Sequence, residues 1–279
     1  MRPVAAGWHL DVDADPVIVY GPRGCGLCMN CRQGMENYCQ QPGGPAAGGL
    51  GRRDGGMAEF LLVPAARYLI PLGSLDPRDA APLSDPALTS YHAINRSRQL
   101  LAPGSTAVVI GAGGLGQMAI QLLRALSATT TIVAVDTGPD KLQTARQMGA
   151  DEALVSGDEA IQRINDITTG QGAELVLDMV SVDRTLQMAA KVSRVLGHLT
   201  IVGLGGGALP VNFNSPRNEC VVASPFWGWI PELVDVVNLA QTGKIRMLVE
   251  HVPLERAGAA YQLLHDGKIK GRAVITPND

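Results

Sequence analysis

The chain has 279 residues, of which 46% are hydrophobic and 18% charged, and its formal net charge is −3. The apolar fraction suffices for a sizeable core, while the weak charge without a Lys- and Arg-rich stretch argues against nucleic-acid or anionic-membrane partners. The sequence contains no run of 18 apolar residues, so it predicts no membrane-spanning helix. Residues 1–16 lack the apolar core of a signal peptide. We therefore expect a soluble, cytoplasmic protein.

Four of the five cysteines lie in the segment CGLCMNCRQGMENYC, at Cys25, Cys28, Cys31 and Cys39. In a reducing compartment, clustered thiols are more often metal ligands than disulfides. Four thiolates close a tetrahedral shell around zinc and leave no open position for substrate. The spacing therefore predicts a structural zinc site, with free or disulfide-bonded cysteines as the alternative. The fifth cysteine, Cys220, lies in an apolar run and is predicted to be an inert core thiol.

The chain changes character near residue 106. Before it, PVIVY (16–20), AEFLLVP (58–64) and RYLIPL (67–72) are predicted strands around a Gly- and Pro-rich loop at 40–57. After it, apolar runs alternate with helical segments, the last of them at 231–244, and this alternation predicts a doubly wound parallel (Rossmann) sheet in residues 88–244. The predicted strands of this sheet are 106–110, 131–135, 152–155, 174–178, 198–202 and 220–223.

The first strand of the predicted sheet is followed by a G-x-G-x-x-G pattern at Gly111, Gly113 and Gly116, which opens a helix. In this strand–turn–helix context the pattern predicts a dinucleotide-binding turn, with the pyrophosphate at the helix N-terminus. Gly114 and Leu115 complete the predicted cofactor-binding turn. The alternative is a Gly-rich turn that arose by chance.

The next strand ends at Asp136, twenty residues after Gly116. A carboxylate at this place accepts hydrogen bonds from both ribose hydroxyls and repels a 2′-phosphate, so the sequence predicts NAD rather than NADP. Lys141, on the following helix, is predicted to reach the ribose or a phosphate.

Together these motifs resemble the medium-chain zinc-dependent alcohol dehydrogenases, in particular bacterial secondary-alcohol dehydrogenases. The resemblance extends from about Asp15 to Thr276, through DPVIVYGPRGCGLCMNCRQGMENYC, PLSDPALTSYHAI, VVIGAGGLGQMAIQLLRAL, VAVDTGPDKLQTARQMGAD and GKIKGRAVI. It implies a partial GroES-like β-rich domain in residues 1–87, to which residues 245–279 return. It also implies hydride transfer between a secondary or primary alcohol and NAD, with zinc as Lewis acid.

The resemblance implies further site residues and an assembly. Asp85 stands where the family has one ligand of its catalytic zinc, with a helix N-cap or turn role as the alternative. Phe226 and Trp227 are implied as apolar walls of the substrate pocket, although Trp227 also suits an oligomer interface. Subunits are expected to pair through the 198–225 region, as a homodimer or homotetramer. Implied cofactor contacts, each with plain packing as the alternative, are Thr89, Val180, Val202, Gly203, Leu204 and Arg272.

The sequence departs from the family pattern in its N-terminal part. The other two catalytic zinc ligands, expected in a GxCxxD-like turn and a Gly-His-Glu run, have no counterpart, and nothing fixes the geometry of His9 as a substitute. We therefore expect an N-terminally truncated dehydrogenase with one, structural, zinc. The alternatives are a non-catalytic NAD-binding relative and a site completed by another chain. A zinc-independent reductase is disfavoured by the four clustered cysteines.

Overall fold

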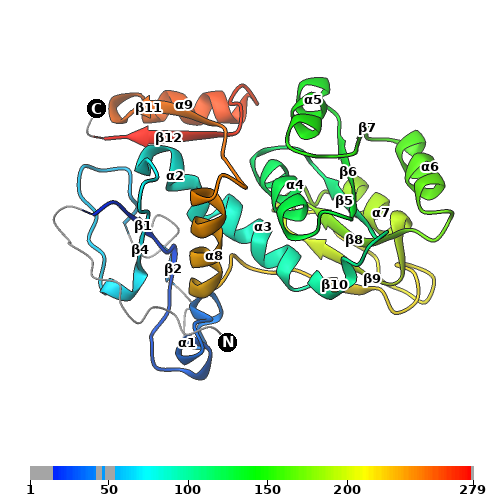
Figure 1. Ribbon diagram of the computed structural model, residues 1–279, viewed down its shortest axis with the longest axis horizontal. Helices are drawn as coiled ribbons and strands as arrows, with labels where there is room; N and C mark the ends of the chain where they lie inside the picture. The colour runs from blue at the N-terminus through cyan, green and yellow to red at the C-terminus, as the bar shows by residue number, and fades with distance from the viewer. Residues whose placement is uncertain (1–14, 42–45, 48–53, 278–279) are drawn as a thin grey trace. The chain divides into compact units, whose positions relative to one another are not determined.

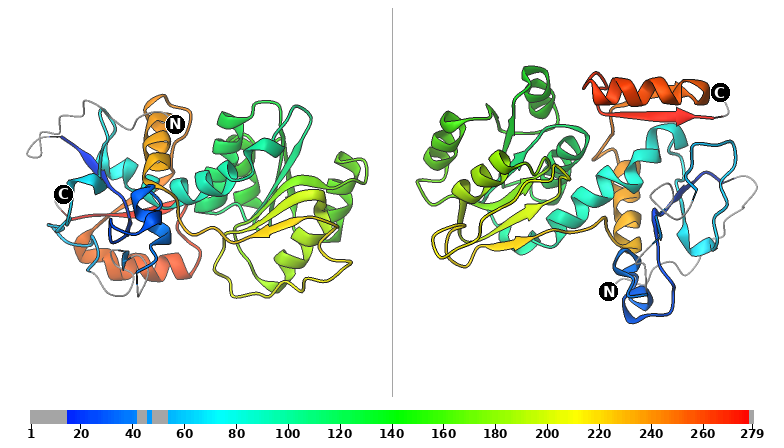
Figure 2. Two further views of the ribbon diagram at one scale, coloured as in Figure 1. Left: turned by 90° about the horizontal axis from the view of Figure 1, so that it is seen from below. Right: turned by 180° about the vertical axis from the view of Figure 1, so that it is seen from behind.

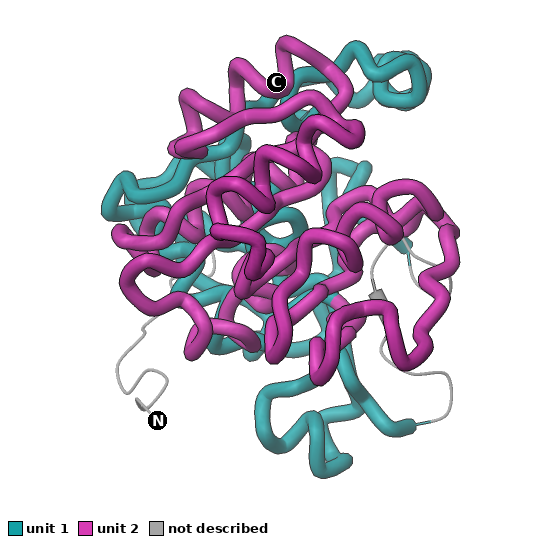
Figure 3. Tube along the Cα trace, turned by 90° about the vertical axis from the view of Figure 1, so that its right-hand side faces the viewer, with its two compact units in different colours: residues 1–88, 227–279 teal, residues 89–226 magenta. Residues whose placement is uncertain are grey.

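The computed structural model describes residues 15–41, 46–47 and 54–277 of the chain. The chain divides into unit 1, residues 1–88 and 227–279, and unit 2, residues 89–226 (Figure 3). Unit 2 is therefore one continuous segment, while unit 1 is built from two segments that are distant in sequence. Among the described residues, no helix combines the length and the apolarity needed to cross a bilayer.

Unit 2 contains a six-stranded parallel sheet in the order β10-β9-β8-β5-β6-β7 (Figure 1). This confirms the doubly wound α/β fold that the alternating pattern predicts. The strands are β5 (Thr106–Ile110), β6 (Thr131–Asp136), β7 (Glu152–Val155), β8 (Ala173–Asp178), β9 (Ser193–Ile201) and β10 (Val221–Ala223). The helices are α3 (Pro86–Asn95), which begins in unit 1, a 3-10 turn (Arg98–Leu100), α4 (Gly114–Leu126), α5 (Pro139–Gln147), α6 (Asp158–Ile167) and α7 (Asp183–Val192).

The centre of the sheet is buried on both faces, as expected of parallel strands that crossover helices cover. All five residues of β5 are buried. On one face, Val108, Val133 and Val176 pack in a cluster with residues of α6 and α7. On the other face Val109 lies beneath α4, because a Cβ on Gly116 would be 3.5 Å from Val109 Cγ1.

The strand order reverses between β5 and β8. From β5 the chain proceeds to β6 and β7 on one side, and then to β8, β9 and β10 on the other. Ile110 pairs with both Val135 and Asp178, and Asp178 pairs with Ile201. The carboxyl ends of these four strands therefore lie along one edge, where open α/β sheets bind their ligands.

In unit 1 the described residues form three pairs of short strands. The pairs are β1 (Val17–Val19) with β4 (Leu69–Pro71) and β2 (Pro22–Arg23) with β3 (Ala46–Ala47), both antiparallel, and β11 (Val249–Pro253) with β12 (Arg272–Thr276), parallel. Helix α9 lies along the β11–β12 pair (Figure 2). The helices are α1 (Met29–Arg32), α2 (Pro77–Ala80), α8 (Ile230–Gln241) and α9 (Ala257–His265), with 3-10 turns at Glu36–Tyr38, Ala66–Tyr68, Ala81–Ser84 and Leu254–Arg256.

Helix α8 lies in a different unit from the one that the sequence suggests. The predicted cofactor domain extends to residue 244, whereas unit 2 ends at Phe226 and α8 belongs to unit 1. The reason is visible in its hydrogen bonds: Gln241 Nε2 donates to the carbonyl of Leu72 (3.0 Å). The N–H of Ile230 donates to the carbonyl of Gly34 (3.4 Å).

The strand predicted at residues 58–64 does not form. Phe60 and Leu62 are 88% and 87% exposed, and residues 58–64 join no sheet in the part of the chain that the structure describes. A strand needs a neighbour for its backbone groups and an apolar face to bury, and the described residues provide this segment with neither. The loop predicted at 40–57 falls partly outside the described residues.

Candidate dinucleotide and metal sites

The glycine-rich turn between β5 and α4 has the geometry of an anion-binding turn. Gly111 has a φ of +92°, a conformation that glycine adopts without penalty. A Cβ on Gly116 would lie 1.9 Å from the carbonyl oxygen of Gly111, so only glycine permits this approach of helix and strand. Gly113, the N-cap of α4, has nothing within 4 Å of a built Cβ. The chain's own packing does not require glycine there, and the space fits a phosphate group at the helix N-terminus.

Asp136, the last residue of β6, is bonded to this turn. Its Oδ2 accepts from the N–H of Ala112 (2.8 Å) and its Oδ1 from the N–H of Gly138 (2.9 Å). Lys141 Nζ lies 3.8 Å from Asp136 Oδ1. Because each carboxylate oxygen has two acceptor positions, the carboxylate retains capacity for ribose hydroxyls. Only 8% of Asp136 is exposed. The two hydrogen bonds from backbone N–H groups hold the orientation of its carboxylate.

The start of α3 also contacts the glycine-rich turn. Ser90 Oγ donates to the carbonyl of Leu115 (3.0 Å). This bond holds Thr89, the preceding residue and an implied cofactor contact, close to the turn in unit 2. Thr89 itself is 9% exposed.

The loops that follow β8 and β9 touch each other. Asp178, fully buried, accepts at Oδ1 from the N–H groups of Val180 and Ser181 (2.9 and 2.8 Å), and its carbonyl accepts from the N–H of Gly203 (3.0 Å). A Cβ on Gly203 would lie 2.3 Å from the Val180 backbone, so glycine is needed for this approach. The side chains of Val180 and Leu204 remain 37% and 100% exposed.

Ser181, directly after Val180, adopts a backbone conformation that favours glycine. Its φ is +61°, in the left-handed region that costs an L-residue roughly 1–2 kcal/mol. The hydroxyl donates to the carbonyl of Asp178 (3.2 Å), which offsets part of this cost. Asp178 is thus a residue of the site that motif reasoning missed, because a buried carboxylate at a strand end has no distinctive spacing.

The structure brings most of the predicted cofactor residues together in unit 2. The glycine-rich turn, Asp136, Val180 and Leu204 follow four strands whose carboxyl ends share one edge. A Cβ on Gly111 would lie 2.6 Å from Val180 Cγ2, so the turns after β5 and β8 are in contact. Val202, 8% exposed, donates its N–H to the carbonyl of Asp178 (2.8 Å). A sheet edge that combines exposed apolar side chains with fixed polar groups fits a dinucleotide.

The other predicted residues are divided between the units. Asp85, Trp227 and Arg272 lie in unit 1, and Phe226, 46% exposed, is the last residue of unit 2. Asp85 is exposed and directly precedes α3. Burial lowers the pKa of Arg272, and the nearby charge of Asp85 opposes this shift. In the described part of the chain, no two further His, Cys, Asp or Glu side chains group with Asp85 as ligands. His9 lies outside the described residues.

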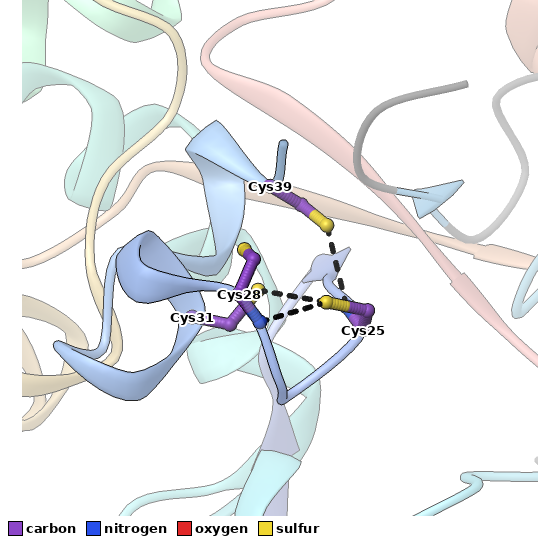
Figure 4. A group of neighbouring side chains, drawn as sticks. All are labelled: Cys25, Cys28, Cys31 and Cys39. Atoms are coloured by element: carbon purple, nitrogen blue, oxygen red, sulfur yellow. Dashed lines mark hydrogen bonds between the residues drawn. The ribbon is translucent and has the colours of Figure 1, made fainter. Parts of the chain in front are cut away.

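The four clustered cysteines converge on one point (Figure 4). Their sulfur atoms all lie within 4.8 Å of one another, and Cys25 Sγ and Cys31 Sγ are 3.9 Å apart. Zinc with four sulfur ligands at about 2.3 Å requires sulfur–sulfur separations of about 3.8 Å, so the arrangement fits this ion. A Cβ on Gly24 would lie 2.5 Å from Cys31 Sγ, which explains the glycine beside the first ligand.

Backbone groups around the cysteines favour thiolates. The N–H groups of Cys28 and Leu27 donate to Cys25 Sγ (3.3 and 3.4 Å), and they lower the pKa of Cys25. Hydrogen bonds from the backbone of Gln40, and then of Cys31, lower the pKa of Cys28 to about 6. Burial instead raises the pKa of Cys31 to about 12, so that thiol needs a cation for its ionisation.

A buried carboxylate supports the cysteine segment from behind. Glu36, 2% exposed, accepts at Oε2 from the Gly24 N–H (2.7 Å) and the Tyr68 hydroxyl (2.6 Å), and at Oε1 from Arg67 Nε (2.8 Å). It thereby joins the residue before Cys25 to the turn that carries Cys39. Sequence reasoning missed this support, because Arg67 follows Glu36 only 31 residues later and no local spacing indicates the pair.

Comparisons with known proteins identify the family of this chain. Residues 114–241 match the family described as zinc-binding dehydrogenase, and residues 12–74 match the alcohol dehydrogenase GroES-like domain. The chain is 34% identical over 266 residues to a D-arabinose 1-dehydrogenase (NADP(+)) of Saccharolobus solfataricus. It is 36% identical over 270 residues to an NAD-dependent alcohol dehydrogenase of Sulfurisphaera tokodaii. Each match covers 94% of this chain and 75% of the relative.

Among solved structures, the alcohol dehydrogenase from the archaeon Aeropyrum pernix superposes with a TM-score of 0.86 at 30% identity, over 94% of this chain and 76% of that one. The chain therefore belongs to the family of medium-chain zinc-binding alcohol dehydrogenases, and the resemblance inferred from its motifs is confirmed. The GroES-like assignment of the N-terminal part is confirmed as well.

Proposed function

We propose that this chain is an NAD-dependent dehydrogenase that interconverts a secondary or primary alcohol with its carbonyl. The main support is Asp136, a nearly buried carboxylate held by the N–H of Ala112 in the glycine-rich turn. The relatives differ in cofactor, since one is named for NADP and another for NAD. The chain's own acidic residue therefore carries the choice, and it favours two ribose hydroxyls over a 2′-phosphate.

Each of the predicted cofactor contacts has a role in this proposal. NAD, when bound, supplies the hydride acceptor. The N-terminus of α4 binds its pyrophosphate, and Gly113 leaves room for the approach. Asp136 and Lys141 hold the adenosine ribose. Val180 and Leu204 offer apolar surface to the rest of the cofactor, and such surface excludes water from the transferred hydride.

The proposal includes a structural zinc but not a catalytic one. The four cysteines fit a structural zinc, whose closed ligand shell holds the segment together and leaves no position for substrate. A catalytic zinc does not fit the described residues, since only Asp85 of the predicted ligand set is among them and no group forms around it. No step of the proposed reaction is therefore assigned to a metal at Asp85.

Cofactor titration tests the proposal directly. The full chain is titrated with NADH and with NADPH, and binding is followed by the emission of the reduced nicotinamide. We expect Asp136→Ala to weaken NADH by about tenfold or more, the size expected for lost hydrogen bonds to a charged group, and to weaken NADPH less. Asp140→Ala, which removes an equal charge from the exposed first turn of α5, is the matched control. Equal NADH and NADPH affinities in the unmodified chain would contradict the cofactor assignment.

Turnover is measured separately, with NAD and a panel of primary and secondary alcohols, and with NADH and the matching carbonyls. Oxidation of the alcohols supports the dehydrogenase. NADH binding without turnover on any member of the panel would favour the non-catalytic, NAD-binding alternative.

The proposal includes a homodimer formed at the edge of the sheet. β10 is the terminal strand and pairs only with β9 within the described sheet, and such an edge presents unpaired backbone groups. Val195, Leu196 and Val221 near this edge are 47%, 61% and 49% exposed. We expect light scattering to give a dimer or a multiple of it, and Val221→Lys to shift it toward monomer.

The proposal also places the protein in the cytoplasm, because clustered free thiols are typical of a reducing compartment.

A further inference from the structure

The cysteine segment is joined to a distant part of unit 1 through buried tyrosines. We define the metal lobe as residues 24–39 and the Trp227 turn as residues 227–230. Tyr68, which donates to Glu36 of the metal lobe, is 2% exposed and stacks on Tyr20 with ring centroids 6.4 Å apart and an interplanar angle of 13°. Their backbones are also bonded, since the N–H of Tyr20 donates to the carbonyl of Tyr68 (2.8 Å).

The Tyr20 hydroxyl lies between the metal lobe and the Trp227 turn. It donates to the carbonyl of Gly228 (2.5 Å), 208 residues away in the sequence. It also faces the backbone of Asn37, whose hydrogen bond opposes the rise that burial causes in the pKa of Tyr20. Tyr20 is fully buried. One hydroxyl therefore links the turn that carries Cys39 to the Trp227 turn, and a second, direct link is the N–H of Ile230 on the carbonyl of Gly34 (3.4 Å).

The Trp227 turn depends on such support. Trp227 has a φ of +57°, a strained conformation for a large residue that persists only where the surroundings enforce it. Its indole N–H donates to the carbonyl of Ser84 (2.7 Å). Its ring lies on the backbone of Gly21, where a Cβ would be 2.4 Å away. The contacts that enforce the turn thus come from Ser84, from Gly21 and from Tyr20 itself.

We propose that occupancy of the four-cysteine site is coupled to the conformation of the Trp227 turn through the hydroxyl of Tyr20. An ion that draws the four sulfurs together fixes the 36–39 turn, and with it Asn37 and Glu36. These two residues hold Tyr20 and Tyr68, and Tyr20 holds Gly228. The coupling lies within unit 1 and goes beyond the dehydrogenase activity, on which it does not rest.

Coupling between two sites is reciprocal, so loosening the Trp227 turn must weaken metal binding. Affinity is measured on the full chain by competition with a chromophoric chelator, with Zn²⁺ and with Co²⁺, at a temperature where every variant is folded. Under that condition a general loss of stability does not change the affinity. We expect Tyr20→Phe, which keeps the stacked ring and removes the hydroxyl, to weaken the metal by about fivefold or more. The matched control is Tyr261→Phe, at a tyrosine that is 59% exposed on α9.

The reverse direction is read from tryptophan emission. We expect removal of the metal to increase acrylamide quenching of the unmodified chain. Trp227→Phe should reduce the metal-dependent part, and the remainder should come from Trp229 of the same turn. In Tyr20→Phe the metal-dependent part should shrink although the Co²⁺–thiolate absorption bands persist. Wild-type metal affinity in both Tyr20→Phe and Trp227→Phe would overturn the proposal. It would show that the metal stabilises only the metal lobe itself. If Tyr20→Phe does not fold, the affinity of Trp227→Phe decides alone.

Discussion

Alanine substitutions at Gly113 and Gly116 separate two tasks of the glycine-rich turn. At Gly116 the new Cβ would lie 1.9 Å from the carbonyl oxygen of Gly111. Non-bonded contacts of a Cβ atom shorter than 3.0 Å essentially never occur, so the helix and the turn must separate by at least 1.1 Å. Overpacking of this kind costs about 1–3 kcal/mol, and alanine returns roughly 0.5–1 kcal/mol as a better helix former. We expect Gly116→Ala to lower the free energy of unfolding by about 1–2 kcal/mol.

Gly113→Ala has the opposite profile. The position has a φ of −74°, which alanine adopts freely, and nothing lies within 4 Å of the added methyl group. We expect the free energy of unfolding to change by less than about 1 kcal/mol, because the weaker N-cap and the stiffer unfolded chain have opposite effects. NADH affinity should nevertheless fall by about tenfold or more, since the methyl group occupies the space required for the close approach of the pyrophosphate.

Two measurements distinguish the variants: urea unfolding followed by circular dichroism, and NADH titration. Wild-type NADH affinity in Gly113→Ala would show that the open space beside the α4 N-terminus is not used by the cofactor. Wild-type stability in Gly116→Ala would refute the close approach of helix and strand. A loss of stability in Gly113→Ala equal to that in Gly116→Ala would remove the distinction altogether.

Two further predictions concern the metal and pH. Cys31→Ser should reduce the zinc content, measured by atomic emission, from one ion per chain to well below one. Cys220→Ser, the control, should retain the full ion. Two tightly bound ions in the unmodified chain would contradict the single structural site. Burial, and secondly the charge of Arg96, lower the pKa of His198 below its ordinary 6.5, so the unfolded state binds that proton more readily. The free energy of unfolding should therefore decrease as pH falls through about 6.5, and His198→Gln should flatten this part of the profile; an unchanged slope would exclude the assignment.

The sheet of unit 2 could be predicted because its strands are continuous apolar runs and its turns carry distinctive residues. The run predicted at residues 152–155 coincides with β7, and the run at 131–135 falls one residue short of β6. Parallel strands buried on both faces have this signature irrespective of what surrounds them. The positions of the glycines and of Asp136 follow from the same local pattern.

Unit 1 was less predictable, because its order depends on contacts between remote segments. The apolar run at 58–64 has strand-like composition and no partner strand within the described residues, so composition alone misleads. The bond from Tyr20 to Gly228 spans 208 residues, and no pattern within either segment indicates it. Helix α8 is amphipathic like the helices of unit 2, so only its contacts, with Leu72 and Gly34, show where it belongs.

The division of the chain has a consequence for how the protein is made. Unit 2 is a continuous segment, and when its last residue, Phe226, leaves the ribosome, the final 53 residues of unit 1 (227–279) have not yet emerged. The dinucleotide-binding edge of unit 2 can therefore form during synthesis. The Tyr20 hydroxyl and the carbonyl of Gly34 find their partners, Gly228 and Ile230, only after the last residues are made. Until then the cysteine segment has only the contacts of the N-terminal segment, such as those of Glu36 with Arg67 and Tyr68.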